Sequence, residues 1–165
     1  MNGMNPDKIL ATMNQHGVAY LLIGGMNFML RHEPNLLTFD IDFWIDDTPE
    51  NRQRCESALA DLDAEWGASD ADWKPVAQRQ PGWLTQQTVF CVNTKHGAVD
   101  IFRRVPGLAD WPTSAQAAKT EQTGGGVTYT GLSDADMLRC QLALDPGIQK
   151  ASRVQKLQTA LNKLP

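Results

Sequence analysis

The chain has 165 residues and a formal net charge of −4, with 42% hydrophobic and 21% charged residues. This length and balance predict one globular domain with a sizeable core. They argue against a general nucleic-acid coat, which needs a basic surface, although a local basic groove stays open. No apolar run approaches bilayer-spanning length and no signal peptide is visible, so we expect a cytoplasmic protein without membrane contact.

The first third of the chain predicts a helix, a buried strand, a glycine turn and a short second helix. Residues 6–16 carry apolar side chains at helical spacing and are followed by a glycine, which is a common helix stop. The apolar run 18–23 predicts the strand, and Gly24-Gly25 predicts the turn after it. The short helix is expected over residues 27–32, because a nearby proline prevents its continuation.

A second strand is predicted over residues 37–45, and it carries two carboxylates. Asp40 and Asp42 are separated by one residue, so in an extended strand they point to the same face. Two like charges on one face repel, and a bound divalent cation removes this cost because it prefers carboxylate oxygens. The strand is too apolar to be a solvated edge. The residues expected to face the core are Phe39, Ile41 and Phe43.

The remaining elements predict a mixed sheet followed by a helical tail. A helix capped by Thr48 runs to about residue 62 or 66, and residues 67–85 form a long loop that holds at most one short strand. The later elements are strands 88–92, 98–102 and 127–129 and helices 113–119, 133–144 and 147–161. The fold class is therefore α/β (α+β), a mixed β-sheet flanked by helices. We expect a domain over 1–131 and a helical segment over 132–165 packed on it as one unit.

Asp100 is a third carboxylate in an apolar setting. It lies between a valine and an isoleucine in the strand predicted over residues 98–102. An aspartate inside a strand usually needs a partner, because burying an unpaired charge is costly. This partner is either a metal ion shared with other carboxylates or one of the arginines that follow, Arg103 and Arg104.

The basic residues of the last predicted helix and the cysteines can also be explained without a catalytic role. Lys150, Arg153 and Lys156 fall on one face of the last predicted helix, where they form either a solvated stripe or the border of an active-site cleft. Cys91 lies in an apolar strand-like run and Cys140 in a helix-like run, and both are expected to be buried, reduced thiols.

Together the motifs resemble the nucleotidyltransferase superfamily, the DNA-polymerase-β-like fold. Its signature is an apolar strand ending in small residues, a short helix, an Asp-x-Asp strand and a third carboxylate on a later strand. The segments that match are Leu22-Ile23-Gly24-Gly25, Phe39-Asp40-Ile41-Asp42-Phe43 and Val99-Asp100-Ile101, in this order. Within the superfamily the chain is most similar to small bacterial stand-alone members, including relatives of the toxins of type IV toxin–antitoxin systems.

The resemblance implies transfer of a nucleoside monophosphate from an NTP to an acceptor hydroxyl, with release of pyrophosphate. The implied metal-binding catalytic residues are Asp40, Asp42 and Asp100, which would hold two Mg²⁺ ions. The implied nucleotide-binding residues are Gly24, Gly25, Asn27, Arg31 and Lys150. The expected partners are an NTP, an acceptor that is a small molecule, a tRNA or a protein, and a cognate partner protein.

The chain also departs from the family pattern, and two other functions stay open. Leu36-Leu37 stands where many relatives have an arginine, and Gln141 stands where related C-terminal helices often have a lysine. These departures favour a second hypothesis, a catalytically silent module of the same fold that binds a nucleotide or a partner protein. A metal-dependent phosphohydrolase is a third and weaker hypothesis, because histidine-rich metal clusters are absent from the sequence.

Overall fold

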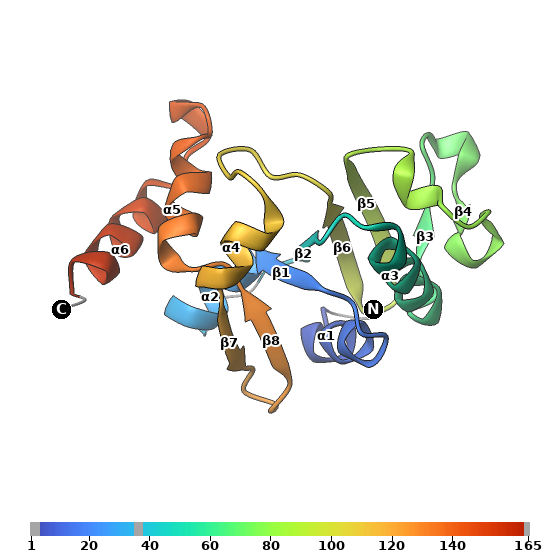
Figure 1. Ribbon diagram of the computed structural model, residues 1–165, viewed down its shortest axis with the longest axis horizontal. Coiled ribbons are helices and arrows are strands. Elements are labelled where there is room, and N and C mark those ends of the chain that lie inside the picture. Colours follow the sequence, from blue (N-terminus) through green and yellow to red (C-terminus); the bar gives the residue numbers. More distant parts are fainter. Residues whose placement is uncertain (1–3, 35–37, 164–165) are drawn as a thin grey trace.

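The computed structural model describes residues 4–34 and 38–163, and in this part of the chain eight strands form one mixed sheet (Figure 1). The strand order is β4-β3-β5-β6-β2-β1-β8-β7, which confirms the predicted α/β class. The strands are β1 (Tyr20–Ile23), β2 (Asp40–Ile45), β3 (Glu65–Trp66), β4 (Lys74–Pro75), β5 (Val89–Thr94), β6 (Gly97–Phe102), β7 (Lys119–Gln122) and β8 (Thr128–Gly131).

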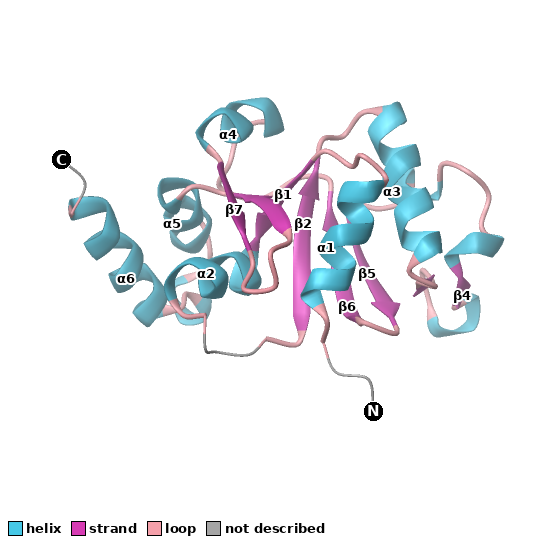
Figure 2. Cartoon of the chain, turned by 90° about the horizontal axis from the view of Figure 1, so that it is seen from below, coloured by secondary structure: helices cyan, strands magenta, loops and turns pink. Residues whose placement is uncertain are grey.

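Helices flank the sheet on both faces and at one end. In Figure 2, α1 and α3 lie beside each other against one face of the sheet. The α5 and α6 helices lie together at the end of the molecule that is far from β3 and β4 (Figures 1 and 2). The helices are α1 (Pro6–Gln15), α2 (Gly24–His32), α3 (Pro49–Asp61), α4 (Trp111–Ala117), α5 (Asp134–Leu142) and α6 (Ala151–Asn162).

Strand β2 lies at the centre of the sheet and separates core side chains from carboxylates. It runs antiparallel to β1 and parallel to β6, so that Asp42 has Ile23 opposite it on one side and Asp100 on the other. Ile41 and Phe43 are fully buried on the opposite face, as predicted. Burial of each such side chain contributes about 1.5–3 kcal/mol, and this fixes the register of the strand.

The prediction that Phe39 faces the core is wrong. Its side chain is 88% exposed, and β2 begins only at the next residue. Because Phe39 precedes the paired part of the strand, the alternation that buries Ile41 and Phe43 does not extend to it.

Two apolar clusters lie on opposite faces of the sheet. The first joins β1, β2, β5 and β6 to α1 and α3. The second joins the other face of β1 and β2 to the helices at the end of the molecule, through Leu21, Phe28, Trp44, Met137 and Leu157. Asp40 and Asp42 share this second face with Trp44, because all three alternate with the core residues of β2. The second face is therefore divided between an apolar part and a carboxylate part.

The α3 and α5 helices each begin at a capping side chain, and the cap of α3 is the one that the sequence predicts. The Thr48 side chain accepts a hydrogen bond from the Asn51 N–H at 3.2 Å and begins α3, which ends at Asp61. The Ser133 hydroxyl accepts from the Asp136 N–H at 3.1 Å and begins α5. The predicted C-terminal helices are confirmed. The second helix, however, starts directly at Gly24 rather than at residue 27.

Two short strands, β3 and β7, were missed, whereas their partners were expected: β8 as a strand over residues 127–129, and β4 as a short strand within the loop. The helix predicted over residues 113–119 ends at Ala117, and β7 begins at Lys119 and pairs with β8. The predicted loop 67–85 contains β4, which pairs with β3, along with three short 3₁₀ turns. All four residues of β7 are exposed, so no apolar alternation marked it as a strand. Within the described residues, no helix has the length and apolar character needed to cross a membrane.

Candidate active site

The three predicted carboxylates meet on one face of the central strands. Asp42 lies directly opposite Asp100 in the parallel β2–β6 pair, and Asp40 precedes Asp42 by two residues. One carboxylate oxygen from each of the three residues lies within 4.8 Å of the other two. All three side chains are partly buried. The prediction that Asp40 and Asp42 share a face is confirmed, and β6 adds the third carboxylate to them.

Burial and mutual repulsion disfavour ionisation of this carboxylate cluster. Burial, followed by the negative charges of Asp40 and Asp100, raises the pKa of Asp42 to about 8. Burial is also the main cause that raises the pKa of Asp100, and the charge of Asp40 adds to it. A cation bound among these oxygens would reverse the effect, because its positive charge favours the ionised form of each carboxylate.

One oxygen of the cluster lacks a partner and fits a metal ligand. Asp42 Oδ1 is buried and accepts no hydrogen bond from the described residues. Such an atom costs free energy unless a donor or a cation satisfies it. The alternative partner for Asp100 is engaged elsewhere, since Arg103 Nε donates to Asp47 at 3.0 Å, and Arg104 is exposed. An all-oxygen donor set of this kind suits a hard divalent cation such as Mg²⁺.

Gly24 brings the first turn of α2 against the carboxylates. Its φ of +69° lies in the left-handed region that favours glycine, and a Cβ at this position would collide with the Asp42 carboxylate. The residue before it, Ile23, makes no side-chain capping hydrogen bond. The uncapped start of a helix attracts anions through its backbone N–H groups and its dipole. The glycine turn therefore places an anion-binding helix end beside a candidate cation site.

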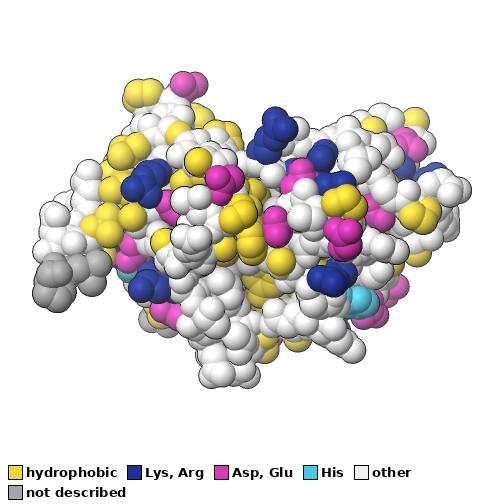
Figure 3. All heavy atoms as spheres, viewed as in Figure 1, with side chains coloured by type: hydrophobic (Ala, Val, Ile, Leu, Met, Phe, Trp, Pro, Cys, Tyr) yellow, Lys and Arg dark blue, Asp and Glu magenta, His cyan; other side chains and the backbone are white. Residues whose placement is uncertain are grey.

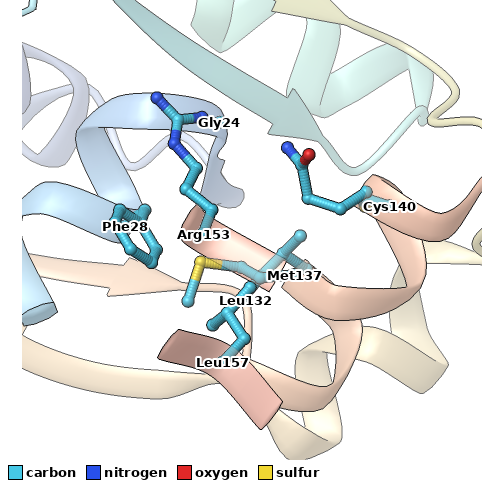
Figure 4. Close-up of a pocket in the computed structure, with 8 residues that line it drawn as sticks. Gly24, Phe28, Leu132, Met137, Cys140, Arg153 and Leu157 are labelled. Carbon is cyan, nitrogen blue, oxygen red and sulfur yellow. The ribbon is translucent and has the colours of Figure 1, made fainter. Parts of the chain in front are cut away.

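Arg153 of α6 reaches the same turn from the opposite direction. Its Nη2 atom lies 3.0 Å from the position that a Cβ on Gly25 would occupy. Its positive charge opposes the rise in the pKa of Asp42. The guanidinium carbon lies 5.4 Å from the ring centre of Phe28, and Figure 4 shows the side chain extending past this ring toward Gly24.

A small pocket with a cavity volume of about 40 Å³ opens between α2 and the α5–α6 pair, next to Arg153 (Figure 4). Its lining is mostly apolar, with the glycine turn at one side. The lining residues that matter for its chemistry are Phe28, Leu132, Met137 and Leu157, which are apolar, and Gln141 and Arg153, which are polar. Apolar walls with a few polar groups are typical of sites for small organic ligands.

Two predicted nucleotide-binding residues, Asn27 and Arg31, bind the start of the C-terminal segment. The Asn27 amide donates to the Leu132 carbonyl oxygen at 3.1 Å, and Arg31 donates to the same oxygen at 2.7 Å. Arg31 also pairs with Asp134 at 3.2 Å, and His32 Nε2 lies 2.8 Å from the same carboxylate. We call these five residues the α2–α5 clamp. Since Asn27 is fully buried, a nucleotide contact by it or by Arg31 stays a prediction.

The basic face predicted on the last helix divides into three different environments. Arg153 reaches the glycine turn, Lys156 pairs with Glu33, and Lys150 is exposed. The Lys150 backbone N–H donates to Gln141 Oε1 at 2.8 Å, which fastens the start of α6 to α5. A nucleotide contact by Lys150 stays a prediction. The helical spacing identified this face, but which of its members meets the site depends on how α6 packs.

The prediction that Cys91 is buried is wrong. Cys91 is exposed and lies opposite Asp100 in the β5–β6 pair, while its neighbours Phe90 and Val92 fill the core. Strand alternation around these two residues was the signal that could have placed Cys91 on the carboxylate face. Partial shielding of its thiol from water raises the pKa of this group, and the charge of Asp100 adds to the effect. Cys140 is partly buried at the pocket.

No protein-family profile matches the chain, and no curated protein sequence is significantly similar to it. Solved structures, in contrast, match nearly its whole length. The antibiotic-resistance factor ANT(2'')-Ia in solution has a TM-score of 0.55 at 14% identity, over 96% of this chain and 81% of that one. The crystal structure of ANT(2'')-Ia in complex with adenylyl-2''-tobramycin has a TM-score of 0.57 at 14% identity, over 93% and 86%.

A candidate nucleotidyltransferase from Thermotoga maritima also matches, with a TM-score of 0.51 at 15% identity over 99% of this chain and 98% of that one. These likenesses show that the chain has the nucleotidyltransferase fold, which the order of its motifs predicted. The departure at Leu36-Leu37 lies outside the described residues.

Proposed function

We propose that the protein is a metal-dependent nucleotidyltransferase, which transfers a nucleoside monophosphate from an NTP to an acceptor hydroxyl and releases pyrophosphate. The observation that carries this proposal is the convergence of Asp40, Asp42 and Asp100 on adjacent strands, beside an uncapped helix start. A buried carboxylate cluster is costly for the fold unless it binds a ligand. Its occurrence within the nucleotidyltransferase fold supports the same activity.

The three carboxylates would have different roles at the reacting phosphate. Asp40 and Asp42 would hold two Mg²⁺ ions, with Asp100 completing the site on the acceptor side. Bound there, Mg²⁺ supplies positive charge that stabilises the in-line displacement at the α-phosphate. Asp100 projects from β6 opposite the exposed Cys91 of β5, and its carboxylate would accept the proton of a hydroxyl that approaches from this side.

The triphosphate would lie against the glycine turn. The N–H groups that begin α2 would donate to phosphate oxygens, and Gly24 allows this approach because it has no Cβ. Arg153 would add a planar guanidinium, which can form two hydrogen bonds to a phosphate. The nucleoside would lie against the apolar mouth of the small pocket between α2 and the α5–α6 pair, which is too small to enclose it.

A small-molecule hydroxyl is the acceptor that we favour. One structure with the same fold contains an adenylylated aminoglycoside, adenylyl-2''-tobramycin. On the face seen in Figure 3, Lys and Arg side chains are scattered among acidic ones rather than gathered into one basic surface. A long polyanion such as tRNA binds best to a continuous basic surface. A tRNA or protein acceptor, a cognate partner protein, a toxin-like role and the cytoplasmic location stay predictions.

The proposal is tested by offering each α-labelled NTP with Mg²⁺ to aminoglycosides, total tRNA and protein extract. We expect label in one acceptor class with the wild type and none with Asp42→Asn. The matched control is Asp70→Asn, which makes the same chemical change at an exposed position and should transfer like the wild type. Transfer by Asp42→Asn at the wild-type rate would contradict the metal-centred mechanism. Absence of both transfer and Mg²⁺-dependent NTP binding would favour the silent module.

A further inference from the structure

Two adjacent glycines separate a carboxylate from a guanidinium. A Cβ on Gly24 would meet Asp42, and a Cβ on Gly25 would meet Arg153 Nη2. The candidate cation site and a fixed positive charge therefore lie on either side of one peptide unit. Arg153 forms no ion pair within 4.0 Å among the described residues, in contrast to Lys156 on the next turn, which pairs with Glu33.

We propose that Arg153 couples the metal site to the nucleotide, by disfavouring a divalent cation bound alone and favouring one bound together with a polyphosphate. This inference rests on the proposed function and assigns it a device for coupled binding. The proposal concerns the direction in which Arg153 changes two binding free energies, that of the metal ion alone and that of the metal ion with a polyphosphate. Arg153 thereby makes occupation of the metal site conditional on the arrival of the substrate.

The first half of the proposal follows from charge alone. A divalent cation adds two positive charges beside Asp42, or one net charge where it displaces a proton from a carboxylate. Arg153 repels this added charge in either case, because arginine stays protonated at all ordinary pH values. Removing the charge of Arg153 should therefore tighten the binding of a metal ion that arrives without a polyphosphate.

The second half follows from the shape of the turn. A polyphosphate that binds the N–H groups beginning α2 would bring negative oxygens to the side of Gly25 where the guanidinium lies. Arg153 then attracts the ligand instead of repelling it. Its guanidinium carbon lies 5.4 Å from the centre of the Phe28 ring, and this contact limits the positions that the guanidinium can take. Removing the charge should therefore weaken the binding of the metal–polyphosphate complex.

The experiment measures both affinities with probes that do not depend on the base or the acceptor. Mn²⁺ alone is titrated by electron paramagnetic resonance, and Mg²⁺-saturated inorganic pyrophosphate by calorimetry. For Arg153→Met, which removes the charge and keeps an unbranched apolar side chain, we expect Mn²⁺ to bind about threefold to tenfold more tightly. We expect Mg²⁺–pyrophosphate to bind about tenfold more weakly.

Two further variants make the result specific to the charge. Arg153→Lys keeps the charge and should leave Mn²⁺ binding within twofold of the wild type, while losing part of the pyrophosphate affinity because lysine cannot form a bidentate contact. Lys156→Met removes a charge one turn away, where Glu33 already neutralises it, and should change neither affinity. Thermal melting confirms that each variant is folded.

The outcomes separate this inference from the function on which it rests. Opposite shifts in the two affinities for Arg153→Met support coupling. Shifts in the same direction, or no shift in either, overturn it while leaving the nucleotidyltransferase proposal intact if the wild type binds both probes. A wild type that binds neither Mn²⁺ nor Mg²⁺–pyrophosphate overturns the proposed function and the coupling together.

Discussion

The candidate site has a sheet half, formed by the three carboxylates, and a helix half, formed by Arg153. The two halves are held in place in different ways. The carboxylates project from β2 and β6, central strands that are hydrogen-bonded on both sides and backed by fully buried side chains. Arg153 projects from α6, which packs on α5, and the α2–α5 clamp fastens this helix pair at its start. The sheet half therefore has strong geometric support, whereas the helix half depends on a few contacts at its junction.

The two halves would therefore have different roles: the sheet half would hold the metal ions, and the helix half would bind the nucleotide. The sheet holds three carboxyl groups close together, despite the cost of burying them, because core burial behind them is large. The helix pair brings the opposite charge from a region with fewer constraints. Changes in the sheet half should therefore act on the metal site and on stability, and changes in the helix half should act on the nucleotide.

Asp42→Asn should produce the largest effect, and it should act in opposite directions on activity and stability. Loss of the central metal ligand should lower nucleotidyl transfer by about a thousandfold or more, since several kcal/mol of charge stabilisation are lost. A pKa raised to about 8 means that the folded protein holds the Asp42 proton more tightly than the unfolded chain, whose carboxyl ionises near pH 4.

The free energy of unfolding of the wild type should therefore fall as the pH rises from about 4 to 8, and asparagine cannot ionise to cause this loss. Without divalent cations at pH 8, we expect Asp42→Asn to be more stable by about 2 kcal/mol, which allows for solvent reaching the cluster. Urea unfolding at pH 4 and pH 8 measures the difference. Equal stability of the two proteins at pH 8 would show that ionisation of Asp42 does not destabilise the fold.

The sheet half was also the part that the sequence predicted best. Alternation along β2 assigned Asp40 and Asp42 to one face, because the strand period applies wherever a strand is paired on both sides. It failed at Phe39, just outside the pairing. The strand that carries Asp100 was also predicted, over residues 98–102 of the observed Gly97–Phe102.

The helix half could be predicted only in outline. Helical spacing placed Lys150 and Arg153 on one face, yet the packing of α6 against α5 and Phe28 decides which of them reaches the turn. The contact with Phe28 joins residues more than 120 positions apart in the chain, and local patterns do not contain such contacts. The roles of Asn27 and Arg31 in the clamp were hidden for the same reason, since their partners follow β8.

Gly24→Ala should disturb the sheet half from the side of the turn. The substitution adds a Cβ against the Asp42 carboxylate and forces alanine to adopt a φ of +69°. We expect transfer to fall by about a hundredfold and stability by about 1–2 kcal/mol, since strain and collision act together. The control is Gly82→Ala, where φ is also positive, at +95°, but the space for a Cβ is open. This control should lose stability and keep full activity, and a matching loss of activity would argue against the role of Gly24.

Arg31→Met should loosen the helix half alone. It removes the hydrogen bond to Leu132 and the ion pair with Asp134 while keeping an apolar side chain. We expect affinity for Mg²⁺–pyrophosphate to fall about threefold to tenfold and amide exchange in α5 and α6 to accelerate, because a partly buried charged pair is broken. Mn²⁺ binding should stay within twofold. Arg52→Met, which breaks a comparable pair with Asp47 beside α3, should leave both affinities unchanged.

Cys91 offers the smallest and most selective test, on the acceptor side of the sheet half. Its side chain is exposed opposite Asp100 and contributes nothing to the core, so Cys91→Ser should keep activity within about twofold. Cys91→Phe places a ring beside Asp100, where the acceptor hydroxyl would approach. It should raise the acceptor KM severalfold while leaving the affinities for Mn²⁺ and Mg²⁺–pyrophosphate unchanged, because the glycine turn and Arg153 lie beyond β2. A Cys91→Phe variant that weakened pyrophosphate binding as well would place the two substrates on the same side of the carboxylates and contradict the assignment of β5 to the acceptor.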